Sequence, residues 1–184
     1  IQEFDWYDEV EVSSDLNAIM TPARHFSGRG LFNGDSTLWA SWVLNLHDEN
    51  IYFSGDTGYM EEFAEIGERY GPFDIAFLES GQYNIAWKEI HMMPDEVVKA
   101  GLDLNADVIL PIHNSKYELA LHRWDEPLEK VSTIGFENNL TVATPLIGQN
   151  YVLGDPVPMD AWWRNVSMGE QPFLKDNSFV GILL

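Results

Sequence analysis

The sequence contains no cysteine, and this absence removes several classes of chemistry together. Disulfide bridges, thiolate nucleophiles and cysteine-ligated zinc are all excluded. The absence does not decide the compartment, because cysteine-free chains occur in both the cytosol and the periplasm. The localisation therefore stays open between cytoplasm and periplasm.

Basic residues are also scarce. Ten Lys and Arg stand against thirty Asp and Glu, which gives a formal net charge of −20 at pH 7. Binding of nucleic acid requires a concentrated basic surface, so DNA and RNA are excluded as partners. No apolar run in the sequence approaches the roughly 18 residues of a membrane-spanning helix. We expect a soluble chain without a transmembrane segment.

The chain does contain enough apolar residues for a folded core. Its 184 residues are 45% hydrophobic and 13% aromatic, which excludes a generally disordered protein. With no internal repeat and no domain boundary, residues 1–184 are expected to form a single domain. The first residue is Ile, and no signal-peptide pattern follows it. The chain is therefore expected to begin inside a longer protein.

The chain is organised around residues 51–58. An apolar run typical of a strand ends in Gly55-Asp56-Thr57-Gly58, and a helical pattern follows. This places Asp56 on a tight turn at the carboxyl end of a strand, where the crevices of layered α/β folds lie. An ordinary turn is an equal alternative, because Gly and Asp form turns on their own account.

Hydrophobic periodicity predicts strands and helices along the whole chain, and hence an α/β (α+β) fold class. The expected strands are 10–12, 16–20, 37–46, 51–55, 74–79, 107–113, 140–147 and 151–153. The expected helices are 59–70, 94–104, 117–124 and 128–134. Pro111 lies inside one strand and predicts an edge position or an early end to its pairing.

Three polar residues follow predicted strands. His25 lies in a loop between Pro22 and Gly28, and His113 ends its strand much as Asp56 does. If these strands run parallel, their side chains project from one edge of the sheet. Two imidazoles and a carboxylate suit zinc, manganese or iron(II) and leave room for a water, which can then ionise and attack a carbonyl or phosphoryl centre. The competing interpretation is a set of unrelated surface residues.

His91 precedes a predicted helix that begins with Pro94-Asp95-Glu96. Proline suits the first helical position, and the amino terminus of a helix favours anions. An imidazole at this location is therefore a candidate for contact with an anionic substrate. The alternative is an imidazole that merely packs at the start of the helix.

Five motifs occur together along most of the chain. They are Thr21-Pro-Ala-Arg-His25-Phe-Ser-Gly-Arg29, Leu38-Trp39, Ile51-Tyr-Phe-Ser-Gly-Asp56-Thr-Gly-Tyr59, His91-Met-Met-Pro94-Asp-Glu and Ile112-His113. In order and separation they resemble the second half of the metallo-β-lactamase superfamily, in particular its N-acylphosphatidylethanolamine phospholipase D-like branch. The resemblance implies half or more of an αββα sandwich with a two-metal site at one edge.

The resemblance also implies roles for individual residues. His25 would ligate one of two divalent metal ions, Asp56 would bridge both, and His113 would ligate the second, with zinc expected first and manganese or iron as alternatives. Asp56 and His91 are the implied catalytic residues, and His91 would donate a hydrogen bond or a proton to a phosphate. The implied reaction is hydrolysis of a small-molecule or lipid phosphodiester by a metal-bridging hydroxide.

The sequence departs from this family in three places. The motif His-x-His-x-Asp-His is absent. It belongs to the amino-terminal half, which is expected to be missing here and supplied upstream or by a second chain. Asn114-Ser115-Lys116 stands where Trp-Gly-Thr is expected, and residues 79–83 replace a more apolar segment ending in Gly-Ala-Tyr.

These departures leave two alternatives open. One is a lactone hydrolase of the ascorbate-6-phosphate lactonase type, which shares the fold and the metal chemistry. The other is a non-catalytic fragment or scaffold, and this fragment alone is expected to be inactive. Half of a sandwich is also expected to expose a large apolar face, which a monomer seldom tolerates.

Overall fold

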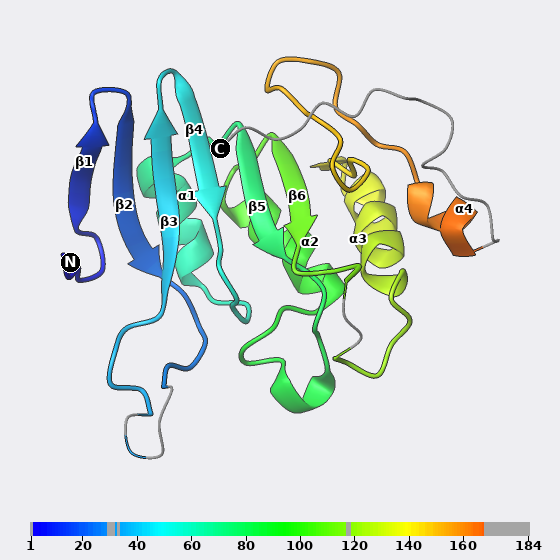
Figure 1. Cartoon of the computed structure of the whole chain (residues 1–184), viewed down its shortest axis with the longest axis horizontal. Coiled ribbons are helices and arrows are strands. Elements are labelled where there is room, and N and C mark those ends of the chain that lie inside the picture. The colour runs from blue at the N-terminus through cyan, green and yellow to red at the C-terminus, as the bar shows by residue number, and fades with distance from the viewer. Residues whose placement is uncertain (1, 29–31, 33, 117–118, 168–184) are drawn as a thin grey trace.

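The computed structural model describes residues 2–28, 32, 34–116 and 119–167, which form one seven-stranded mixed sheet (Figure 1). The strand order is β1-β2-β3-β4-β5-β6-β7, so each strand lies beside its neighbours in sequence. The first four strands pair antiparallel, and β4 to β7 pair parallel. The strands are β1 (Glu9–Ser13), β2 (Leu16–Pro22), β3 (Ala40–Leu46), β4 (Glu49–Phe53), β5 (Ile75–Glu79), β6 (Val108–Ile112) and β7 (Thr141–Val142).

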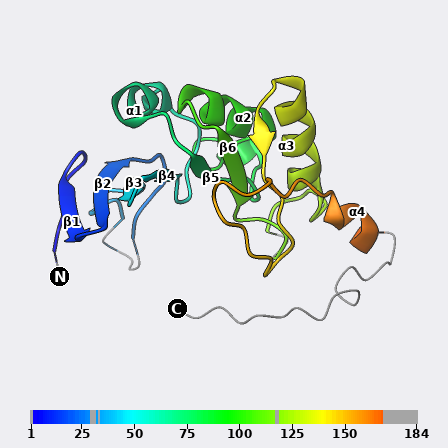
Figure 2. The ribbon, with the colours of Figure 1, turned by 90° about the horizontal axis from the view of Figure 1, so that it is seen from above.

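Helices α1 (Glu62–Tyr70), α2 (Pro94–Asp103) and α3 (Glu126–Glu137) cover one face of the sheet (Figure 2). Each joins two successive parallel strands, as parallel pairing requires a crossover. Their apolar side chains and those of the strands form one buried core, which includes Val43, Tyr52, Phe63, Ile66, Leu78 and Val97. Two short helices complete the regular structure of the described residues: the 3₁₀ helix η1 (Ile85–Trp87) and the α-helix α4 (Trp162–Ser167).

The opposite face of the sheet is only partly covered. Near β5 and β6, Ile75 and Val108 pack against the irregular segment 151–157. Toward β3 and β4, Leu46 and Phe53 remain 38% and 40% exposed. Figure 2 shows the three helices on the other side of these strands.

The α/β class is confirmed, and most elements lie where periodicity predicts them. The expected helix 128–134 is part of the longer α3, and the expected strand 37–46 begins at Ala40. The strand expected at 140–147 is wrong in extent, because only Thr141 and Val142 pair with β6. Pro145 cannot donate to a ladder, which is consistent with the early end.

Two expected elements are wrong. Residues 151–153 do not form a strand, and they pack on the sheet face through their side chains instead. Of the helix expected at 117–124, residues 119–124 are not helical, and 117–118 lie outside the described residues. Leu119 and Leu121 are 68% and 94% exposed, so no buried apolar stripe stabilises a helix there.

The prediction for Pro111 holds only on one side of β6: the pairing with β7 ends at Ile109, whereas the pairing with β5 continues through Pro111 to Ile112, so β6 is not an edge strand. Among the helices of the described residues, none is both long and apolar enough to cross a bilayer.

Candidate metal centre and active site

The sheet topology brings the predicted site residues to one edge. Strands β4, β5 and β6 run parallel, and the residues at or just beyond their carboxyl ends are Asp56, Glu79 and His113. Strand β2 runs in the same direction as β4, because each is antiparallel to β3. His25, which follows β2, therefore lies at this edge as well.

The loops that carry His25 and Asp56 are bonded to each other. The amide of Arg24 donates to Oγ1 of Thr57 at 2.8 Å, and the amide of Gly58 donates to the carbonyl of Arg24 at 2.9 Å. Thr57 is fully buried. These bonds join Arg24, the residue before His25, to Thr57 and Gly58, the two residues after Asp56. The His25 and Asp56 side chains are therefore held at a fixed position relative to each other.

Two glycines let the other loops approach closely. A Cβ on Gly58 would lie 2.2 Å from the carbonyl oxygen of Glu89, in the segment that leads to His91. A Cβ on Gly81 would lie 1.8 Å from the carbonyl oxygen of His113. Neither position can take a side chain without displacing backbone. Glycine therefore brings the His91 segment to the Asp56 loop, and the loop after β5 to His113.

The four predicted residues lie together. Nε2 of His113 is 3.8 Å from Oδ1 of Asp56. The His91 ring lies between two other imidazoles in contact distance, with its centroid 5.4 Å from that of His25 and 5.5 Å from that of His113. The side chains of Asp56 and His113 are 47% and 33% exposed, so both are open to a ligand from solution.

The hydrogen bond of His25 fits a metal ligand. Its Nδ1 lies 3.1 Å from the carbonyl oxygen of Phe26. A carbonyl only accepts, so Nδ1 carries the proton and Nε2 keeps its lone pair. Metal-ligating histidines commonly use a backbone carbonyl in this way to fix the tautomer and the ring orientation.

His113 has an unusual backbone. Its φ is 61°, in the left-handed region that favours glycine. The following Asn114 donates from its amide group to the carbonyls of Pro111 and Ile112 at 3.0 and 3.2 Å, which supports the turn. Non-glycine residues in this region are concentrated at functional sites.

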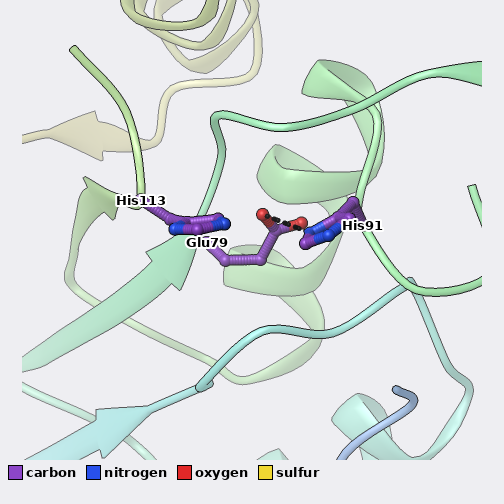
Figure 3. Close-up of side chains that lie close together, drawn as sticks. All are labelled: Glu79, His91 and His113. Atoms are coloured by element: carbon purple, nitrogen blue, oxygen red, sulfur yellow. Dashed lines mark hydrogen bonds and ion pairs between the residues drawn. The ribbon is translucent and has the colours of Figure 1, made fainter. Parts of the chain in front are cut away.

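Glu79 is the site residue that the sequence prediction missed (Figure 3). Its side chain is fully buried, and Oε1 accepts a hydrogen bond from the amide of Met92. Oε2 lies 3.3 Å from Nδ1 of His91. One ligand-type atom from each of Glu79, His91 and His113 falls within 4.8 Å of the others. The signal was present, because Glu79 ends an apolar parallel strand between the strands of Asp56 and His113.

Two backbone amides in the segment before α2 are already hydrogen-bonded. The amide of Met92 donates to Glu79, and the amide of Met93 donates to Glu96 at 2.9 Å. Both donors are therefore satisfied by carboxylates of the chain. The imidazole of His91 is left as the polar group of this segment that faces the cluster.

Two tyrosines beside the site stay protonated over the ordinary pH range. Burial raises the pKa of Tyr59, and its hydrogen bond to Asp103 at 2.6 Å raises it further. Burial also raises the pKa of Tyr83 well above its usual value, with a contribution from the hydrogen bond to Glu126 at 2.7 Å. Both hydroxyls act as donors that tie the site loops to α2 and α3.

Several known proteins are similar to this chain in sequence. The model of the beta-lactamase superfamily domain matches residues 1–114. An uncharacterized protein of Mycobacterium tuberculosis is 42% identical over 167 residues, covering 89% of this chain and 44% of that protein. The mitochondrial N-acyl-phosphatidylethanolamine-hydrolyzing phospholipase D of Saccharomyces cerevisiae is 35% identical over 142 residues, covering 73% of this chain and 30% of the enzyme. The chain thus spans less than half the length of these relatives.

Solved structures agree on the fold. An isothiocyanate hydrolase from Delia radicum gut bacteria matches with a TM-score of 0.60 at 23% identity, covering 79% of this chain and 58% of that structure. Together with the sequence matches, this shows that the chain belongs to the metallo-β-lactamase superfamily.

Proposed function

We propose that this chain is part of a metal-dependent hydrolase that cleaves phosphodiesters, and that His25, Asp56 and His113 hold divalent metal. The observation that carries the proposal is the meeting of these three residues and His91 at one sheet edge, each from a different loop. The match to a phospholipase D supports the phosphodiester as substrate class.

The donor set fits a metal ion. Nδ1 of His25 is engaged with a carbonyl, which leaves Nε2, and Nε2 of His113 approaches a half-exposed carboxylate. Imidazole and carboxylate together suit zinc first, then manganese or iron(II). Bound metal of this kind supplies a water acidified enough to attack phosphoryl or carbonyl centres and polarises the centre that is attacked.

The chain's own residues supply positioning and proton transfer. Asp56 would neutralise part of the positive charge of a metal ion held there. His91 offers a hydrogen bond or a proton to a phosphate oxygen or a leaving group. A positioned imidazole in this role contributes about 10²–10⁴-fold in rate.

We further propose that residues 1–184 belong to one domain completed by the upstream part of the same polypeptide, or by a second chain, that carries His-x-His-x-Asp-His. The half-exposed apolar face over β3 and β4 supports this completion, as does the chain's coverage of less than half of its relatives. Two measurements on this chain test the proposal: its molar mass in solution by light scattering, and the binding of a hydrophobic dye to exposed apolar surface. A dye-silent 21 kDa monomer would count against a missing partner.

Hydrolysis assays test the reaction. They use the intact protein, that is, this chain together with the part that completes its domain, loaded with zinc. Bis(p-nitrophenyl) phosphate is the phosphodiester probe, and a simple lactone is the carbonyl probe. We expect the wild type to hydrolyse the phosphodiester, and we expect the rate to fall about 10²–10⁴-fold in His91→Gln. Turnover of the lactone alone would replace the phosphodiesterase with a lactone hydrolase, and no turnover of either would favour a non-catalytic scaffold.

A further inference from the structure

We infer that Glu79 is a positioning residue that holds His91 in the tautomer with its proton on Nδ1, so that Nε2 is the nitrogen available to substrate. The role assigned to His91 rests on the proposed function, whereas the tautomer itself does not. Glu79 lies at the end of β5 and is fully buried, so its hydrogen-bond partners are fixed by the fold.

Both oxygens of Glu79 serve the segment before α2. Oε1 accepts from the amide of Met92, and Oε2 faces Nδ1 of His91 at 3.3 Å. With Glu79 as a carboxylate, Oε2 accepts, and we therefore assign the proton to Nδ1 of His91. Nε2 is then the ring nitrogen that is left for the substrate.

The position of the ring makes this choice consequential. The His91 ring contacts the rings of both His25 and His113, the two proposed histidine ligands. A ring rotated or protonated differently at this location would present the wrong nitrogen to the cluster. Partners that fix metal-ligating histidines typically affect metal affinity or activity by about 10–100-fold, and we expect an effect of similar size for His91.

The alternative is that Glu79 is itself a metal ligand with His91 and His113, as the 4.8 Å cluster allows. We favour the positioning role because each of its oxygens already has a donor from the protein. In addition, its side chain is fully buried, whereas that of Asp56 is 47% exposed. A ligand role would also predict that metal is lost when Glu79 is replaced.

The variant Glu79→Gln distinguishes control of the His91 tautomer from simple attachment of the segment through the Met92 amide. The Met92 amide can only donate, so the glutamine must direct its oxygen to Met92 and its NH₂ group to His91. The segment keeps its anchor, but Nδ1 of His91 must now accept, and the ring proton moves to Nε2. The substitution is nearly isosteric and inverts the tautomer without removing the loop contact.

Glu96→Gln is the matched control. Glu96 accepts from the amide of Met93 in the same segment, at 2.9 Å, and none of its hydrogen bonds involves a histidine. The Glu96→Gln variant therefore loses one negative charge in the same segment as Glu79→Gln does, and it leaves the contacts of the His91 ring unchanged. Its kcat and the His91 tautomer are expected to stay as in wild type.

Nitrogen-15 NMR of the histidine rings in the intact, zinc-loaded protein reads the tautomer directly, with the His91 signal assigned by its loss in His91→Gln. We expect Nδ1–H in wild type and Nε2–H in Glu79→Gln. With bis(p-nitrophenyl) phosphate as probe, kcat should fall about 10–100-fold with KM nearly unchanged. Zinc content should stay equal to wild type.

The same variant in a His91→Gln background should lose nothing further, because Glu79 acts through His91. Nε2–H in wild type, an unchanged tautomer in Glu79→Gln, or loss of zinc in that variant would each overturn the inference. The wild-type spectrum decides the matter even if the variant fails to fold. If neither probe is turned over, the proposed function fails, and the tautomer measurement in metal-free protein still stands on its own.

Discussion

Nε2 of His113 lies 3.8 Å from Oδ1 of Asp56, although the two residues are 57 positions apart and follow different strands. The pair is held by the parallel alignment of β4, β5 and β6 and by loops in close contact at Gly58 and Gly81. The two side chains are partly exposed and lack the burial that would make such a pair a structural ion pair. Since an exposed pair contributes little to stability, we propose that these two side chains bind a cation.

The backbone of His113 predicts a difference between two substitutions. Asn tolerates a φ of 61° as readily as His, whereas the β-branched Val does not. We expect His113→Val to lower the free energy of unfolding of the metal-free protein by roughly 1–2 kcal/mol more than His113→Asn. Urea unfolding measures both. Equal stability would show that the left-handed conformation is not maintained at this residue.

Gly81→Ala is predicted to be strongly destabilising. The added Cβ would lie 1.8 Å from the carbonyl oxygen of His113, and backbone cannot yield as a flexible side chain can. We expect a loss of more than about 2 kcal/mol in unfolding free energy, or a displaced His113 with weaker metal binding. Gly34→Ala is the control, because its Cβ would meet nothing within 4 Å. Similar results for both variants would contradict the packing described here.

The contact between α3 and α4 predicts an acid-sensitive stability. The hydrogen bond from Arg164, with a second from Trp163, lowers the pKa of Glu129 below its usual value. The carboxylate therefore contributes stability above the ordinary glutamate pKa, and this contribution is lost as pH falls through the lowered pKa of the folded state. Because both side chains of this pair are largely exposed, solvent screening keeps the effect small.

Glu129→Gln tests this contact. The variant should unfold at lower denaturant concentration than wild type at pH 7, and the difference should shrink as the pH falls through the acidic range. Glu137→Gln, at the end of the same helix, offers a charge-matched comparison. A difference between Glu129→Gln and wild type that does not change with pH would contradict the assigned cause.

Much of this site follows from local sequence patterns. Apolar strands that end in Asp56 and His113 predict a common edge once the strands are parallel, and the constrained loop around His25 points to the same place. Glu79 follows the same rule, but its buried partner His91 lies twelve positions away, across η1. Hydrophobic periodicity in the sequence cannot predict a hydrogen bond between two residues that an irregular segment separates.

The later part of the chain was harder to predict for a related reason. Residues 140–153 are apolar and β-branched enough to suggest strands, yet only two of them pair. Ala143, Tyr151 and Leu153 instead pack on the sheet through their side chains, which composition cannot distinguish from pairing. Likewise, α3 extends to Glu137, beyond the predicted end at residue 134, although Phe136 is 84% exposed and only Gly135 of the added residues at this end is buried.

The central claim is that Asp56 helps to hold metal at this edge, and metal analysis of Asp56→Asn tests it most directly. Asp48→Asn makes the same change in the β3–β4 turn at the opposite end of the strands. Elemental analysis of the intact protein should find divalent metal, with zinc first, in wild type and Asp48→Asn. Asp56→Asn should lose affinity by more than the roughly 10–100-fold that follows loss of an outer partner. Equal metal content in all three proteins would contradict the account.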